Sequence, residues 1–72
     1  MTLYPNPVKD VLHFDAGSAV TKAGIYTVNG QLINIIAAYN NTLSLKTLPQ
    51  GVYILEVTTI NGNVSKQQIL KE

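Results

Sequence analysis

The sequence predicts an all-β protein, a sandwich of two packed antiparallel sheets built from about seven short strands. Short segments rich in Val, Ile, Leu, Thr and Tyr alternate with Pro, Gly and Asn at close intervals, which is typical of strands joined by tight turns. Two Asn-Gly dipeptides stand between apolar segments, where they favour hairpins. We expect residues 1–72 to form one domain with a single core, because a chain of 72 residues is too short for two.

Composition excludes several classes of function. Charged residues make up 12% of the chain and the formal net charge is +1, so we expect no basic surface of the kind that nucleic acid requires. The absence of cysteine excludes a disulfide framework and a thiolate metal site, and we expect no cofactor. No segment approaches the ~20 apolar residues of a membrane span. The N-terminus lacks the pattern of a signal peptide, so a signal for export would lie upstream.

The first residues predict a stiff, extended lead. Pro5 and Pro7 fix their own φ angles and push Tyr4 and Asn6 towards extended conformations. We therefore expect residues 3–7 to enter the domain in an extended form.

The next segments predict two strands. Residues 11–14 alternate, with Leu12 and Phe14 on the face that we assign to the core. A turn is expected over residues 15–18. Residues 20–28 also favour an extended conformation, but apolar side chains occur on both of their faces, so the inward face stays open.

Hairpin turns are expected at the two Asn-Gly dipeptides, which are Asn29-Gly30 and Asn61-Gly62. A type I′ turn needs positive φ at two successive residues, which this dipeptide tolerates. The first hairpin leads to a strand over residues 31–36, and the β-branched residues there favour a strand over a helix.

The second half of the chain shows the clearest alternation. Residues 42–46 place Leu43 and Leu45 on one face. Residues 51–59 alternate most regularly, and we expect this strand to be central. Its predicted core residues are Tyr53, Leu55 and Val57.

A turn followed by a tyrosine precedes the central strand. Leu48, Pro49 and Gly51 stand just before Tyr53, an arrangement typical of the tyrosine corner in immunoglobulin-like sandwiches. The sequence therefore predicts an immunoglobulin-like antiparallel β-sandwich in which the tyrosine hydroxyl bonds to upstream backbone.

The last predicted strand, residues 64–71, alternates poorly. Neither of its faces is consistently apolar, so we expect an edge strand or a strand with a bulge. An edge strand also offers a route to self-association.

Catalytic chemistry is not expected. His13 is the one histidine, and it lies on the less apolar face of a short strand, so we interpret it as a surface residue. The carboxylates are Asp10, Asp15, Glu56 and Glu72. They form no calcium-binding loop pattern, and no nucleophile, base and stabilising group can be assembled. The sequence predicts that the protein is not an enzyme.

The four tyrosines suggest an alternative function. Tyr4, Tyr26, Tyr39 and Tyr53 would form a sugar-stacking platform if they shared a face. A carbohydrate-binding or adhesion module of a secreted protein, with an exposed tyrosine such as Tyr39, is therefore the second hypothesis.

Nearly the whole chain resembles the type A C-terminal sorting domains of the type IX secretion system, also called the Por secretion system. The markers, in chain order, are Leu3-Tyr4-Pro5-Asn6-Pro7, Ile25-Tyr26-Thr27-Val28-Asn29-Gly30-Gln31-Leu32-Ile33, Leu48-Pro49-Gln50-Gly51-Val52-Tyr53-Ile54-Leu55, Gly62-Asn63-Val64 and Gln68-Ile69-Leu70-Lys71-Glu72. Thr27 stands where family members often carry an acidic residue, and Gln67-Gln68 stands where lysines are common.

The resemblance implies a non-catalytic sorting signal at the end of a larger secreted protein of a Bacteroidetes-type bacterium. Such a domain directs an N-terminal cargo from the periplasm across the outer membrane to the cell surface or the medium. Its implied partners are the outer-membrane translocon and a sortase-like protease that often removes the domain. The terminal strand would be recognised through Val64, Lys66, Ile69, Leu70 and Lys71, by pairing with a partner edge.

Overall fold

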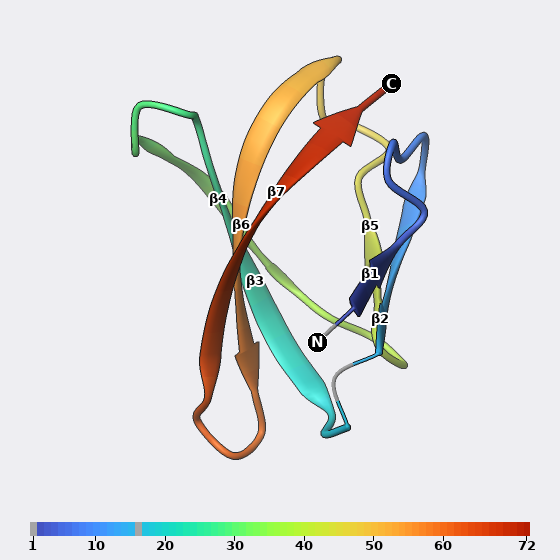
Figure 1. Ribbon diagram of the computed structural model, residues 1–72, viewed down its shortest axis with the longest axis vertical. Coiled ribbons are helices and arrows are strands. Elements are labelled where there is room, and N and C mark those ends of the chain that lie inside the picture. Colours follow the sequence, from blue (N-terminus) through green and yellow to red (C-terminus); the bar gives the residue numbers. More distant parts are fainter. Residues whose placement is uncertain (1, 16) are drawn as a thin grey trace.

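The computed structural model describes residues 2–15 and 17–72, which fold into seven strands (Figure 1). The strands are β1 (Thr2–Tyr4), β2 (Val11–Asp15), β3 (Val20–Tyr26), β4 (Leu32–Ala37), β5 (Thr42–Ser44), β6 (Gly51–Thr59) and β7 (Val64–Lys71). The described residues contain no helix, so the predicted all-β class is confirmed.

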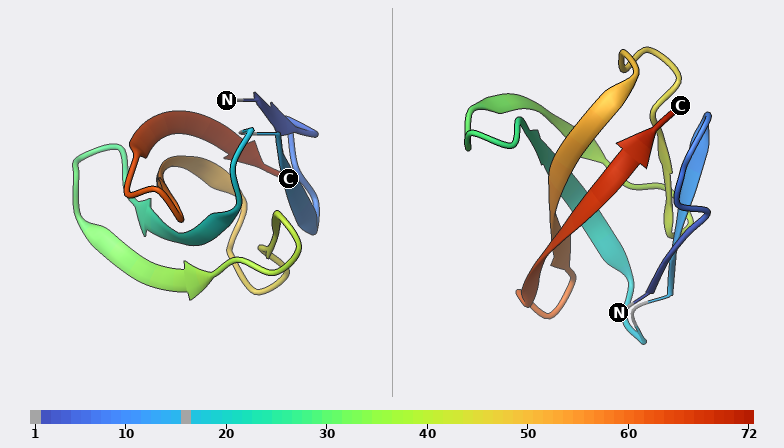
Figure 2. Two further views of the ribbon diagram at one scale, coloured as in Figure 1. Left: turned by 90° about the horizontal axis from the view of Figure 1, so that it is seen from below. Right: turned by 45° about the horizontal axis from the view of Figure 1, so that its top comes forward.

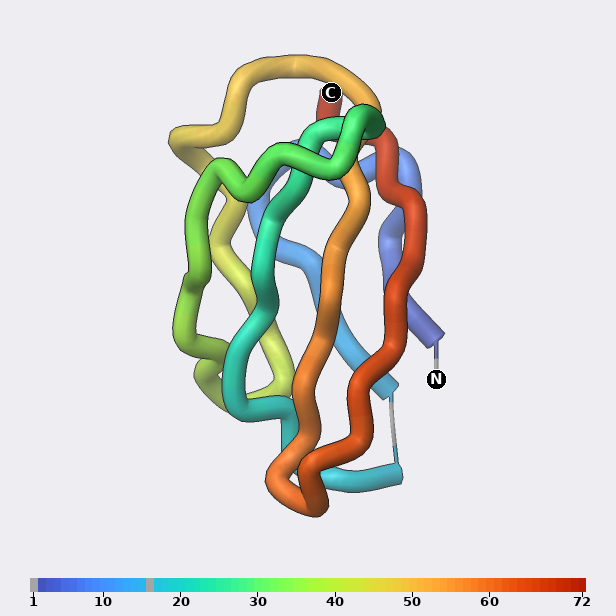
Figure 3. Tube along the Cα trace, turned by 90° about the vertical axis from the view of Figure 1, so that its left-hand side faces the viewer, coloured from blue at the N-terminus to red at the C-terminus, as the bar shows by residue number. Residues whose placement is uncertain are grey.

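The strands form two antiparallel sheets that pack against each other (Figures 1 and 2). The three-stranded sheet has the order β1-β2-β5, and the four-stranded sheet has the order β4-β3-β6-β7. Figure 3 looks onto the four-stranded sheet, with β4 in green at one edge and β7 in red at the other. The predicted sandwich and the central position of β6 are confirmed.

The core lies between the two sheets. Leu12, Phe14, Leu43 and Leu45 on the three-stranded side are each 4% exposed or less, as predicted. The four-stranded sheet contributes Ala23, Ile25, Tyr53, Leu55, Val57 and Ile69. The inward face of β3, which alternation alone leaves open, is therefore the face of Ala23 and Ile25.

The turn before β6 forms the predicted tyrosine corner. The Tyr53 hydroxyl donates a hydrogen bond to the carbonyl oxygen of Pro49, with an O···O distance of 2.8 Å. Leu48 packs against the core from the same turn. Gly51 adopts a φ of 152°, which residues with a side chain rarely adopt. This turn fixes the direction in which the chain enters β6.

Both Asn-Gly hairpins form where predicted, but the type I′ assignment is wrong. Gly30 and Gly62 have positive φ, whereas Asn29 and Asn61 do not. In each hairpin the glycine N–H donates to the carbonyl three residues earlier, at 2.9 Å. This is a three-residue loop, in which a type I turn is followed by a left-handed glycine. In the first hairpin the additional loop residue is Val28, because Thr27 N donates to the carbonyl of Gln31 at 2.9 Å across the loop, and β4 begins at Leu32.

The positive φ pair that characterises a type I′ turn occurs elsewhere. Asn40 and Asn41 have φ angles of 50° and 55°, and Tyr39 and Thr42 exchange two backbone hydrogen bonds of 3.0 and 2.9 Å around them. Asparagine adopts this left-handed conformation more readily than most residues with a side chain, and here Asn41 Oδ1 also accepts a hydrogen bond from Val20 N at 2.9 Å. The polar break before β5 is thus a tight hairpin turn.

The extended lead predicted for residues 3–7 is wrong beyond Tyr4. β1 ends there, and the chain bends at residues 5–7 before it reaches β2. The bend accompanies a contact between the side chain of Asn6 and β7. The turn predicted over residues 15–18 includes Ala16, which lies outside the described residues.

Candidate functional site

β7 is the edge strand that the sequence predicts, and it contains no bulge. Its register with β6 runs without a shift from Val64 opposite Thr58 to Lys71 opposite Gly51. Beside the turn, Thr59 N donates to the carbonyl of Asn63 at 2.9 Å. Bonded and non-bonded pairs alternate along an antiparallel ladder. The odd-numbered residues of β7 therefore bond to β6, and the even-numbered residues direct their N–H and C=O groups to the outer edge.

The same alternation separates the side chains that the sequence singles out. Ile69 and Lys71 face the core and are 1% and 6% exposed, whereas Val64 and Leu70 are 55% and 42% exposed on the opposite face. Lys66 shares that outer face with them. The structure thus gathers Val64, Lys66 and Leu70 on one surface and places the other two of the five predicted residues beneath it.

The first half of β7 extends past the three-stranded sheet. Figure 1 shows the β6–β7 hairpin projecting below the ends of β1, β2 and β5. Ser65 and Gln67 face inward there, and they are only partly buried. This partial burial explains the poor alternation of the sequence, because polar side chains are tolerated where an inward position is not fully buried.

The terminal half of the outer edge is covered by the leading segment. Val8 N donates to the carbonyl of Leu70, and Glu72 N donates to the carbonyl of Val8, both at 2.8 Å. The Asn6 side chain adds two contacts: its Oδ1 accepts from Leu70 N at 3.0 Å, and its Nδ2 lies 3.4 Å from the carbonyl oxygen of Gln68. We call Asn6 and Val8 the edge clamp.

The edge clamp is a feature that sequence reasoning misses. Val8 is fully buried and forms a parallel bridge with Lys71, so it anchors the lead in the core. The one signal in the sequence is the asparagine held between Pro5 and Pro7, and it does not reveal its distant partner.

The first half of the outer edge, at Val64 and Lys66, remains open. Among residues 2–15 and 17–72, no segment pairs with the backbone here. Lys66 Nζ lies 3.8 Å from an oxygen of Glu56, and the Lys66 side chain is 68% exposed. β7 therefore has an open half and a clamped half.

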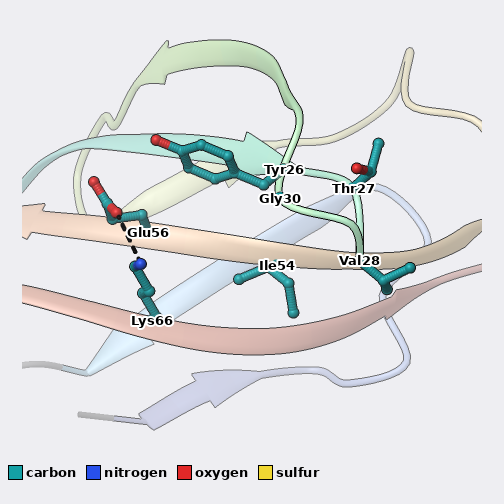
Figure 4. A pocket seen from close by; sticks show the side chains of 7 residues that line it. All are labelled: Tyr26, Thr27, Val28, Gly30, Ile54, Glu56 and Lys66. Atoms are coloured by element: carbon teal, nitrogen blue, oxygen red, sulfur yellow. Dashed lines mark ion pairs between the residues drawn. The ribbon is translucent and has the colours of Figure 1, made fainter.

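A shallow pocket adjoins the open half on the outer face of the four-stranded sheet (Figure 4). Tyr26, Thr27, Val28, Gly30, Ile54, Glu56 and Lys66 line it. Its volume is about 200 Å³, and the ion pair of Glu56 and Lys66 closes one side of it. These side chains offer apolar contact and charge.

Other candidate chemistry is dispersed. His13 stacks on the ring of Tyr4, with centroids 5.2 Å apart and an angle of 13° between the rings. In the part of the chain that the structure describes, no group of three His, Cys, Asp or Glu side chains could hold a metal ion. No helix of the described chain is long and apolar enough to cross a membrane.

The tyrosines considered for sugar binding lie in different environments. Tyr53 belongs to the core, Tyr26 lines the pocket, and Tyr4 stacks on His13. Tyr39 is 77% exposed beside the turn that precedes β5.

The described strands define a small β-sandwich with one open half-edge on β7. Residues 2–71 match the family described as the secretion system C-terminal sorting domain. Beta-agarase D of Zobellia galactanivorans is 30% identical over 70 residues, which cover 97% of this chain and 14% of that protein. No solved structure matches the chain. The chain belongs to the family of secretion system C-terminal sorting domains.

Membership confirms the predicted resemblance. The chain is a sorting signal for the type IX secretion system, and the protein that carries it is secreted or displayed at the cell surface. Domains of this family are in general non-catalytic. The chain spans about one seventh (14%) of the relative's length, and the source of that relative fits the predicted Bacteroidetes origin.

Proposed function

We propose that β7 carries the sorting signal and that the outer-membrane translocon recognises it by adding a strand to its open half. The observation that carries this proposal is the division of the outer edge: backbone groups at Val64 and Lys66 face outward beside exposed side chains, while the edge clamp covers the remainder. Unpaired backbone groups supply affinity in strand addition, and neighbouring side chains supply specificity.

The five predicted recognition residues have two roles in this mechanism. Val64, Lys66 and Leu70 contact the translocon from the outer face. Ile69 and Lys71, which are nearly inaccessible, hold the strand in the sandwich. The domain is therefore the substrate of the export machinery and has no catalytic activity of its own.

We propose that this domain follows a cargo in the protein that carries it. We propose that a sortase-like protease of the secretion system removes the domain after export, and that the cargo is then released or attached to surface lipopolysaccharide. Mass spectrometry of a reporter recovered from the cell surface tests this step. Loss of residues 2–71 from the mature reporter is expected, and a mature reporter that retains them would contradict it.

The experiment for strand addition is a proline substitution on the open edge. A signal peptide, a reporter and residues 1–72 are fused and expressed in a host that has the secretion system. Lys66→Pro removes the outward N–H and leaves the bonds of the odd-numbered residues to β6 in place, which an edge position tolerates. We expect it to abolish surface delivery.

Lys66→Ala is the matched control, because it removes the same side chain and keeps the N–H. We expect this variant to lose only the side-chain contact, and therefore to deliver clearly more reporter than Lys66→Pro but less than the wild type. Circular dichroism of the isolated variants checks that both fold. Wild-type delivery by a folded Lys66→Pro variant would overturn strand addition, and equal loss in both variants would assign recognition to the side chain alone.

A further inference from the structure

We propose that Asn6 is a positioning residue for the recognition strand: its side-chain amide replaces a peptide group of a neighbouring strand and holds residues 68–70 of β7 in the sheet. This inference rests on the proposed role of β7. It assigns a task to a residue that lies 64 positions from the backbone group it contacts, Leu70 N.

The polarity of the two contacts fixes the orientation of the amide. A backbone N–H only donates and a backbone C=O only accepts. Asn6 Oδ1 must therefore face Leu70 N, at 3.0 Å, and Nδ2 must face the Gln68 carbonyl, at 3.4 Å. A strand that paired with this edge would present the same acceptor and donor. Among side chains of this length, only asparagine offers both in a neutral planar group at neutral pH.

The prolines on either side of Asn6 explain why a side chain, and not the backbone, contacts β7 at this point. Pro5 and Pro7 have no N–H, so the leading segment cannot form a regular ladder with β7 at those positions. Val8 does pair through its backbone, at 2.8 Å in both directions, and its buried side chain keeps the segment in place. The amide of Asn6 thus extends a backbone contact that the prolines would otherwise end at Val8.

The position of Asn6 also limits where a partner can pair. A strand that adds at Val64 and Lys66 meets the Asn6 amide at Gln68, so the addition ends there. At the same time the contact keeps Leu70, which is 42% exposed, on the same outer face as the open half. Asn6 therefore sets both the length of the free edge and the alignment of the surface beside it.

Amide hydrogen exchange of the 72-residue chain tests the contact. In Asn6→Ala we expect the Leu70 amide to exchange about tenfold faster, in line with the loss of one hydrogen bond. The Ile69 and Lys71 amides, which bond to β6, should exchange as in the wild type. Uniform acceleration of all three amides would indicate a general loss of stability, and unchanged exchange at Leu70 would also overturn the proposal.

A pH profile of Asn6→Asp separates hydrogen bonding from packing. Below a pKa of about 4 the carboxyl group is protonated and again offers both a donor and an acceptor. Above it, the ionised group can still accept from Leu70 N, but it has no donor and repels the Gln68 carbonyl. We expect Leu70 protection, corrected for intrinsic exchange, to be near the wild-type value at about pH 3 and lower at about pH 7, where repulsion from the Gln68 carbonyl moves the carboxylate away from β7. Protection independent of pH would overturn the proposed pairing.

Surface delivery of the reporter fusion completes the test. If Lys66→Pro blocks delivery and Asn6→Ala lowers it at least about fivefold while the domain stays folded, Asn6 positions the recognition strand. If Lys66→Pro blocks delivery and Asn6→Ala does not affect it, the positioning role is wrong and the proposed function stands. Delivery that persists in Lys66→Pro would instead remove the proposed function on which the inference rests.

Discussion

The two edge strands of the four-stranded sheet are held in place differently. β4 is apolar in sequence, yet Leu32, Ile33 and Ile35 are each 45% exposed or more. β7 is more polar, yet it buries Ile69 and Lys71 and is joined to the leading segment through the edge clamp. An edge strand is thus held by its contacts with the opposite sheet and with distant segments, and its own hydrophobicity is a poor guide to burial.

Both edges use an asparagine to cover an outward N–H group. On β4, Asn34 Oδ1 accepts from Ile35 N at 2.8 Å, one residue away. On β7, Asn6 Oδ1 accepts from Leu70 N at 3.0 Å, across most of the chain. Covered N–H groups resist unwanted strand pairing. The bond on β4 joins neighbouring residues and connects no second element. The bond on β7 connects the segment between β1 and β2 to the last strand.

Proline substitution on β4 is the strongest test of this difference. Ile35→Pro removes an N–H that bonds to Asn34 and not to β3, so the ladder between β3 and β4 is kept. We expect surface delivery of the reporter to stay at the wild-type level, whereas Lys66→Pro lowers it to less than about a tenth. Loss of delivery in a folded Ile35→Pro variant would show that the translocon does not distinguish the two edges.

Core truncation separates the strands by stability. Ile69→Ala removes a side chain that is 1% exposed, while Ile35→Ala removes one that is 56% exposed. We expect the first to lower the free energy of unfolding by about 2–4 kcal/mol and the second to change it by less than ~0.5 kcal/mol. Urea denaturation followed by circular dichroism measures both. Similar losses would mean that β4 contributes to the core as much as β7 does.

Much of the fold follows from local patterns. Strict alternation predicts the core faces of β2 and β6 and the buried positions Leu43 and Leu45, because each face of a strand meets one environment along its whole length. The spacing of Pro49, Gly51 and Tyr53 predicts the tyrosine corner, because the hydroxyl and the carbonyl that it contacts belong to residues only four positions apart.

Other features depend on partners that no local pattern specifies. The inward face of β3 is set by the two strands that flank it, and the turn type at Asn29-Gly30 depends on whether Val28 joins the loop. The edge clamp pairs residues at opposite ends of the chain. Within the candidate site, the alternation of β7 predicts an edge, whereas its division into open and clamped halves requires the position of Asn6.

A smaller effect tests the asparagine of β4. Asn34→Ala frees the N–H of Ile35, so we expect the amide exchange of Ile35 to rise by up to about tenfold. No change in the melting temperature is expected, because the bond joins neighbouring residues and holds no second element in place. A clear drop in the melting temperature would show that Asn34 has a structural role like that of the edge clamp, and the contrast between the two edges would then fail.

The smallest expected effect concerns the ion pair across β6 and β7. Lys66 Nζ and Glu56 lie 3.8 Å apart, and their side chains are 68% and 33% exposed. Water and salt weaken such a pair, so we expect Glu56→Gln to change the free energy of unfolding by less than ~0.5 kcal/mol, and by still less at ~1 M salt. A loss above ~1 kcal/mol that disappears at high salt would show that this pair holds β7 in place. The expected result would mean that Ile69 and the edge clamp, and not this ion pair, hold β7 in place. The Lys66 ammonium could then leave Glu56 and pair with an acidic group of a binding partner.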